Sequence, residues 1–196
     1  MYMNWSFSSK LLQRKQDLLT SGYDAYVLFT LQGLELDISE ELNNNYDYCI
    51  ATPLTKMSHR SRGGNKYDVQ EILLGGYIFV YLRKGRDINK VKSTKNYFRI
   101  LSRQNDDGKL CGKDLEYAEW VLEQEGVLSV SEAIKINGMV KIVNGPLKNL
   151  EGSIVEYSKR NRNCRIEVEL FGQKVDAWLP FDWIDADMGD LKITQK

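Results

Sequence analysis

The sequence predicts an α+β protein of two domains: an N-terminal domain with an antiparallel sheet flanked by helices, and a small C-terminal domain made of strands. Two observations support this. Residues 25–125 alternate between runs of β-forming residues and segments whose apolar side chains recur at helical spacing. From residue 134 onward, short alternating strands are separated by turns at intervals of roughly eight to twelve residues, as in a small β-barrel. The chain has 196 residues, of which 42% are hydrophobic, enough for a packed core.

The first 52 residues predict a helix, a strand, a second helix and a second strand, in that order. Residues 8–20 offer a serine cap and leucines on one helical face, which predicts a short amphipathic helix, with an unstructured leader as the alternative. Residues 25–30 are apolar on both faces, as in a central strand. Leu34, Ile38 and Leu42 are spaced four residues apart. This spacing predicts a helix over residues 35–44 that ends at three asparagines. Residues 48–52 read as a second strand.

The middle of the chain reads as a hairpin followed by shorter elements. Residues 56–66 are polar and contain glycines, which predicts a mobile hairpin tip. The runs 67–74 and 77–82 surround Gly75 and Gly76, which indicates antiparallel strands or a bulge. We expect a short helix over residues 87–95, a strand over 97–101 and a helix from Asp114 through Glu123. Small and polar residues from Gly126 predict a linker.

Charge is unevenly distributed along a chain whose formal net charge is zero. Residues 24–55 carry six acidic and no basic side chains, residues 56–103 carry twelve basic and three acidic ones, and residues 104–133 carry two basic and eight acidic ones. The basic segment is suited to phosphate contacts, while overall neutrality limits indiscriminate binding to nucleic acid.

Several classes of protein find no support. The longest apolar runs are about five residues, far short of a membrane span, and no secretory signal is recognisable, so we expect a cytoplasmic protein. The three cysteines are widely spaced and read as reduced structural thiols rather than metal ligands. His59 is the single histidine and lies in the polar hairpin segment, so we expect neither an enzyme nor a cofactor or metal site.

Four segments together resemble the NusG family of transcription factors. Residues 138–155 look like the KOW motif, and residues 168–175 continue as such domains do. Upstream, residues 26–35 and 75–80 are similar to the opening strand–turn–helix and to a later strand of the family's N-terminal domain. Residues 174–184 are similar to specialised paralogues of the LoaP type. Two positions depart from the family pattern: Ala25 replaces a tryptophan and Gly75 a proline.

The resemblance implies a domain plan and a function. It implies an N-terminal extension over residues 1–24, a NusG-like N-terminal domain over 25–125, a linker over 126–136, an SH3-like KOW barrel over 137–187 and a tail over 188–196. It also implies a monomeric, non-catalytic factor for processive transcription antitermination or elongation, which binds RNA polymerase and nascent RNA at selected operons. The alternatives are a housekeeping NusG whose KOW domain binds Rho or a ribosomal protein, and a ribosome-associated KOW protein.

The same resemblance implies the site residues. Phe29, Tyr77 and Phe79 would contact the polymerase clamp helices, although periodicity alone reads them as core residues. Arg60, Arg62 and Lys66 on the hairpin would run along upstream or non-template DNA, with a solvated basic face as the alternative. An RNA hairpin would contact six cations of the KOW domain, where an ordinary charged turn is the alternative. These six are Lys141, Lys148, Lys159, Arg160, Arg162 and Arg165.

Overall fold

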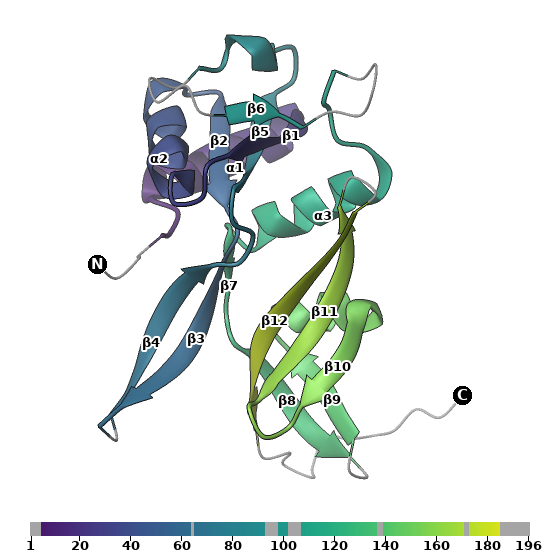
Figure 1. The fold of residues 1–196 in the computed structure, drawn as a ribbon. Coiled ribbons are helices and arrows are strands. Elements are labelled where there is room, and N and C mark those ends of the chain that lie inside the picture. Colours follow the sequence, from purple (N-terminus) through teal and green to yellow (C-terminus); the bar gives the residue numbers. More distant parts are fainter. Residues whose placement is uncertain are drawn as a thin grey trace. The chain divides into compact units, whose positions relative to one another are not determined.

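The computed structural model describes residues 5–63, 65–92, 98–101, 107–136, 139–170 and 173–184. These residues form helices and strands of a mixed α+β protein (Figure 1). They divide into two compact units: the main segment of the first ends at Leu128, and the second begins at Ser129. The α+β class predicted from the sequence is therefore confirmed.

The first unit is built on a four-stranded antiparallel sheet. Its strands lie in the order β2 (Cys49–Pro53), β5 (Tyr77–Arg83), β1 (Tyr23–Thr30) and β6 (Phe98–Ile100). Strand β5 lies between β1 and β2, which are joined by the helix α2 (Glu35–Asn45). This is a split β-α-β arrangement, in which the connecting helix covers the strand inserted between its two neighbours.

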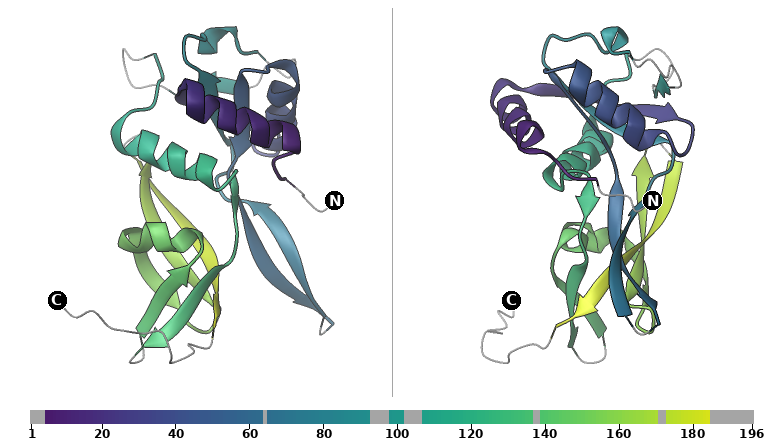
Figure 2. Two further views of the ribbon diagram at one scale, coloured as in Figure 1. Left: turned by 180° about the vertical axis from the view of Figure 1, so that it is seen from behind. Right: turned by 90° about the vertical axis from the view of Figure 1, so that its left-hand side faces the viewer.

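Helices cover both faces of this sheet, which explains why β1 and β5 are apolar without alternation. On one face, Ile38 and Leu42 of α2 pack into a buried cluster with Ile78, Val80 and Leu82. The other face carries α3 (Gly112–Glu123), where the Tyr81 hydroxyl donates to the Ala118 carbonyl at 2.6 Å. The right-hand view of Figure 2 shows α1 and α3 on one side of the sheet and α2 on the other.

The N-terminal segment belongs to the first unit, which corrects the expectation of an extension over residues 1–24. Helix α1 (Ser9–Ser21) buries Leu18 completely, and its Ser8 hydroxyl caps the first turn by accepting from Leu11 N–H. The Arg14 guanidinium is buried and donates to the carbonyls of Asn43 and Cys49 at 3.1 and 2.5 Å. Because a buried guanidinium needs such acceptors, α1 is held to both α2 and β2.

A long hairpin projects from the central sheet (Figure 1). It consists of β3 (Thr55–Arg62) and β4 (Asn65–Ile72), with the short β7 (Val127–Leu128) parallel to β3. The hairpin expected at residues 56–66 is present, but most of that segment is strand and not turn. The run 67–74 pairs back onto β3, and not with 77–82, because the turn at Gly75 and Gly76 leads the chain into the central sheet.

The base of the hairpin is tied to the N-terminal segment. Trp5 N–H donates to Gln70 Oε1 at 2.6 Å, and Gln70 Nε2 returns a bond to the Trp5 carbonyl at 3.0 Å. The indole N–H of Trp5 donates to Thr52 Oγ1 at 3.0 Å, and Gln70 also donates to Thr55 Oγ1. A single glutamine amide thus pairs with a main chain sixty-five positions away and holds β4 beside residue 5.

Two further elements were expected after β5. Of the range 87–95, where a helix was expected, the described residues 87–92 contain one 3-10 turn, η1 (Ile88–Lys90), which Asp87 caps by accepting from Asn89 N–H at 2.9 Å. The strand expected over 97–101 is β6. Residues 93–97 lie outside the described residues.

The second unit is a five-stranded sheet with the order β10-β11-β12-β8-β9. Strands β8 (Ser131–Ile136) and β9 (Met139–Asn144) pair antiparallel, and the turn η2 (Pro146–Ser153) leads on to β10 (Ile154–Ser158). Strand β11 (Asn163–Leu170) follows. The last strand, β12 (Gln173–Trp183), pairs parallel with β8. Cys164, Ile166, Leu179 and Phe181 are buried.

The boundary between the two units, after Leu128, lies within the linker expected over residues 126–136, but that segment also contains the strands β7 and β8. Ser131 and Ala133 are fully buried, and β8 pairs on both of its edges. Small, polar residues looked like a loop in the sequence, yet they fit a crowded position between two strands. The expected tail over 188–196 lies outside the described residues.

Candidate functional site

A row of side chains crosses three neighbouring strands of the first unit. Phe29 on β1 lies opposite Tyr77 on β5 and opposite Arg99 on β6. The two aromatic rings meet edge to face, with centroids 5.4 Å apart, and the Arg99 guanidinium lies 5.1 Å from the Phe29 ring centroid. Phe29 and Tyr77 are half-buried, Arg99 is exposed, and the nearby Leu31 is 62% exposed. We call Tyr77, Phe29 and Arg99 the aromatic row.

A buried carboxylate and a glycine hold the aromatic row in place. Glu35 is 2% exposed, and its oxygens accept from Gly33 N–H at 2.7 Å and from Gly76 N–H at 2.6 Å. Gly76 has a φ of +85°, and a Cβ there would lie 2.9 Å from the Thr30 carbonyl oxygen and 3.2 Å from the Phe29 ring. The turn that starts β5 therefore admits only glycine without displacement of Phe29. Sequence reasoning missed the role of Glu35, whose signal is an acid in the first turn of a helix after a glycine.

Phe79 does not belong to this surface, which corrects the expectation that it contacts polymerase. Its side chain is fully buried, and its ring lies 5.9 Å from that of Tyr117 on α3. Alternation places Phe79 on the same face of β5 as Tyr77, as predicted. Helix α3 covers the part of that face containing Phe79, so Phe79 is a core residue and Tyr77 is the half-exposed one.

The hairpin carries its basic residues beside an acidic one. Arg60 is exposed and forms an ion pair with Glu71 across the two strands. Register places Lys56 opposite Glu71 and Arg60 opposite Tyr67, so these side chains share a face. The side chains of Arg62 and Lys66 lie outside the described residues, as does that of His59. Of the cations predicted for the hairpin, Arg60 is thus described and is partly neutralised.

The turn at residues 159–162, between β10 and β11, is here called the basic turn, and together with Arg165 it is less cationic than its sequence indicates. Lys159 and Arg160 are exposed, but Arg162 lies 3.6 Å from Asp182. Arg165 bonds to Glu156 and to Asp176, each at 3.2 Å. The hydrogen bond that Arg165 donates to Glu156, together with the bond it donates to Asp176, raises the pKa of Arg165. Sequence reasoning missed these partners because they are distant in sequence and become neighbours only through pairing of β10, β11 and β12.

Lys141 and Lys148 are exposed but lie on other elements. Lys141 is on β9, opposite Ile134 of β8, and Lys148 lies in η2. The strand order places three strands between β9 and β10, so hydrogen-bonded pairing does not bring Lys141 beside the turn. The six cations predicted for RNA therefore do not form one cluster by strand pairing.

An aromatic cluster next to the basic turn was missed from the sequence. We call three aromatic residues the end cluster: Tyr157, Phe181 and Trp183. The Phe181 ring meets each of the other two rings edge to face. The available signal was that positions 181 and 183 share a face of one strand, while Tyr157 directly precedes the turn.

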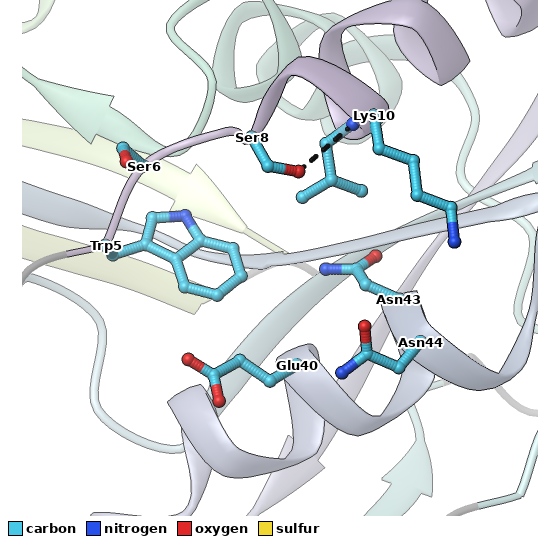
Figure 3. Close-up of a pocket in the computed structure, with 8 residues that line it drawn as sticks. Trp5, Ser6, Ser8, Lys10, Glu40, Asn43 and Asn44 are labelled. Atoms are coloured by element: carbon cyan, nitrogen blue, oxygen red, sulfur yellow. Dashed lines mark hydrogen bonds between the residues drawn. The ribbon is translucent and has the colours of Figure 1, made fainter.

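The first unit contains a pocket of about 260 Å³ between the start of α1 and α2 (Figure 3). Its polar walls serve the fold: Asn43 exchanges hydrogen bonds with the main chain of Ala51 at 2.7 and 2.8 Å, and the Trp5 indole bonds to Thr52. The lining residues are Trp5, Ser6, Ser8, Lys10, Leu11, Glu40, Asn43 and Asn44.

The three cysteines are free thiols. Burial raises the pKa of Cys49 and of Cys164 to about 12, whereas Cys111 is exposed at the start of α3. Among the described residues, no cluster of His, Cys, Asp and Glu side chains is arranged to hold a metal ion. Within the same residues, no helix has the length and apolar character needed to cross a bilayer.

Comparison with known proteins finds similarity to solved structures. No family model and no curated protein matches the sequence. The chain is similar to a solved structure that describes domain interaction in Thermotoga maritima NusG, with a TM-score of 0.48 and 19% sequence identity. The match covers 81% of this chain and 93% of that one.

Proposed function

We propose that this chain is a non-catalytic transcription elongation factor of the NusG type, and that it acts in the cytoplasm as an antiterminator at selected operons. In this proposal the first unit docks on the clamp helices of RNA polymerase through the aromatic row. The second unit takes nascent RNA next to its basic turn. The hairpin, with Arg60, runs along upstream or non-template DNA.

The aromatic row is the observation that carries the proposal. Phe29 and Tyr77 occupy the positions at which the sequence resembles the polymerase-contacting strands of the family, and both rings are partly open to solvent. Stable interfaces use such apolar anchors within a charged rim, and here Arg99 supplies the rim while Leu31 adds exposed apolar surface. Glu35 and Gly76 hold the two rings in one geometry before any partner arrives, which reduces the entropy lost on docking.

The mechanism follows from linked binding. RNA held by the second unit raises the effective concentration of the first unit at the polymerase that is synthesising that RNA. Once docked, the factor favours elongation to the extent that it binds the elongating conformation more tightly than the paused one. No chemical step by the protein is required.

The test is a terminator-readthrough assay with purified RNA polymerase and the full chain, on templates with and without the leader of the operon beside the gene. Phe29→Ala and Tyr77→Ala should each raise the concentration needed for half-maximal readthrough by about 30-fold, the effect of losing one interface anchor. Full activity in both variants would contradict docking through the aromatic row.

A matched control is available in the same unit. Tyr48 is also half-buried, has a neighbouring aromatic ring 5.6 Å away, and carries the Arg86 guanidinium 4.4 Å from its ring centroid. Tyr48→Ala removes the same kind of contact from a different place and should leave readthrough unchanged. Equal losses in Tyr48→Ala and Phe29→Ala would indicate general destabilisation instead of a docking surface.

A further inference from the structure

The end cluster of the second unit is a partly exposed set of rings around a buried one. Phe181 is 1% exposed, its ring centroid lies 6.5 Å from that of Tyr157 and 5.2 Å from that of Trp183, and both contacts are edge to face. Tyr157 is 39% exposed and Trp183 is half-buried. Phe181 therefore fixes the positions of two rings that both reach solvent.

Backbone pairing makes the end cluster rigid. Strand β12 pairs with β8 so that Phe181 lies opposite Ser131 and Trp183 opposite Ala133. The chain continues in register, since Ile184 N–H donates to the Ala133 carbonyl at 3.0 Å. On the other side, Tyr157 lies opposite the buried Cys164 in the β10–β11 pair. Each exposed ring is thus carried by a strand and not by a loop.

The basic turn adjoins these rings directly. Phe181 N–H donates to the Arg162 carbonyl at 2.9 Å, and Arg162 adopts a left-handed conformation with a φ of +50° that turns the chain there. Lys159 and Arg160, both exposed, follow Tyr157 by two and three positions. Aromatic faces and cations are therefore neighbours at one end of the sheet.

The carboxylates near the basic turn lie on the opposite face of the strands. Glu156 alternates with Tyr157 on β10, and Asp176 and Asp182 alternate with Phe181 and Trp183 on β12. These acids accept from or lie near Arg165 and Arg162 on that outer face. The charge that would repel phosphates is thus directed away from the rings.

We propose that Tyr157 and Trp183 are a stacking platform for unpaired nucleotides of RNA, with Arg160 in contact with the phosphates. This inference rests on the proposed function, in which the second unit takes nascent RNA, and narrows it to unpaired segments such as a hairpin loop. In a duplex the base faces are stacked on each other, whereas unpaired bases stack on aromatic side chains without much dependence on sequence.

The experiment measures RNA affinity of the full chain by fluorescence anisotropy. The probe is a labelled single-stranded RNA of mixed sequence, about twelve nucleotides long, used alone and annealed to its complement. The wild type should bind the single strand more tightly than the duplex. Tyr157→Leu and Trp183→Leu should each weaken single-strand binding about tenfold, the effect of losing one stacked base. Tyr157→Phe keeps the ring and should bind as the wild type does.

Trp178 supplies the matched control, because it is 37% exposed and lies on the other face of the same strand, β12. Trp178→Leu should leave affinity unchanged. If the wild type binds RNA but Tyr157→Leu and Trp183→Leu bind equally well, the stacking platform is refuted while the proposed function stands. If the wild type binds duplex in preference to single strand, the platform is likewise refuted. Absence of binding to either probe would overturn both this inference and the RNA-binding part of the proposed function.

Discussion

Leu18 and Leu19 test whether the N-terminal helix is part of the folded first unit. The two side chains are adjacent on α1, but Leu18 is 0% exposed and Leu19 is 52% exposed. Truncation of a buried leucine to alanine costs about 3 kcal/mol, because apolar contacts are lost and a cavity remains. The same truncation at an exposed position changes the free energy of unfolding by about 0.5 kcal/mol or less. Leu18→Ala should therefore lower the Tm of the first unit by about 10 °C, and Leu19→Ala by about 2 °C or less.

The assay is tryptophan fluorescence during thermal and urea unfolding of the full chain. Replacement of Trp178 and Trp183 by phenylalanine leaves Trp5 and Trp120, so that the signal reports the first unit. The two leucine variants are compared in that background. Equal and small effects for Leu18→Ala and Leu19→Ala would refute the packing of α1 and return residues 8–20 to the status of a leader outside the domain.

Three further predictions concern a turn, a hydrogen bond and a thiol. Gly76→Ala should cost about 2 kcal/mol in urea unfolding, because the residue needs a positive φ and its Cβ would press on main chain; an unchanged midpoint would contradict this. Gln70→Ala leaves the buried Trp5 N–H without its 2.6 Å acceptor and should cost about 1–3 kcal/mol in the same assay. The pKa of Cys49 is raised from 9.0 to about 12 by burial, so above pH 9 the unfolded chain releases a proton that the folded chain keeps. Stability should then fall by about 1.4 kcal/mol per pH unit between pH 9 and 12 on account of this thiol, and Cys49→Ala should show a smaller slope in urea unfolding at pH 9 and 10.5.

Local pattern predicted most of the helices and strands, because each depends on side chains close in the sequence. The apolar spacing of residues 35–44 and the β-forming run at 25–30 correspond to α2 and β1 within two residues at each end. The shorter elements were predicted less well. A helix was expected over residues 87–95, but the described part of that range, residues 87–92, contains a single 3-10 turn. Ser131 and Ala133 look like part of a linker in the sequence, whereas β8 pairs on both edges.

The candidate sites divide in the same way. Alternation correctly placed Tyr77 and Phe79 on one face, but which of the two reaches solvent depends on where α3 lies, and α3 is far away in the sequence. The count of cations located a turn with exposed basic residues, but it did not show that the Arg165 guanidinium is paired with carboxylates on two neighbouring strands.

The sequence by itself determined the fold class, the positions of most helices and strands, and where basic and aromatic residues concentrate. Those properties follow from periodicity and composition over a few residues. Only the tertiary structure decided which side chains are exposed, which charges are paired, and that the N-terminal helix and the end cluster exist as packed features. Burial and ion pairing are relations between segments brought together by strand pairing and helix packing, and in this chain those segments are separated by tens of residues.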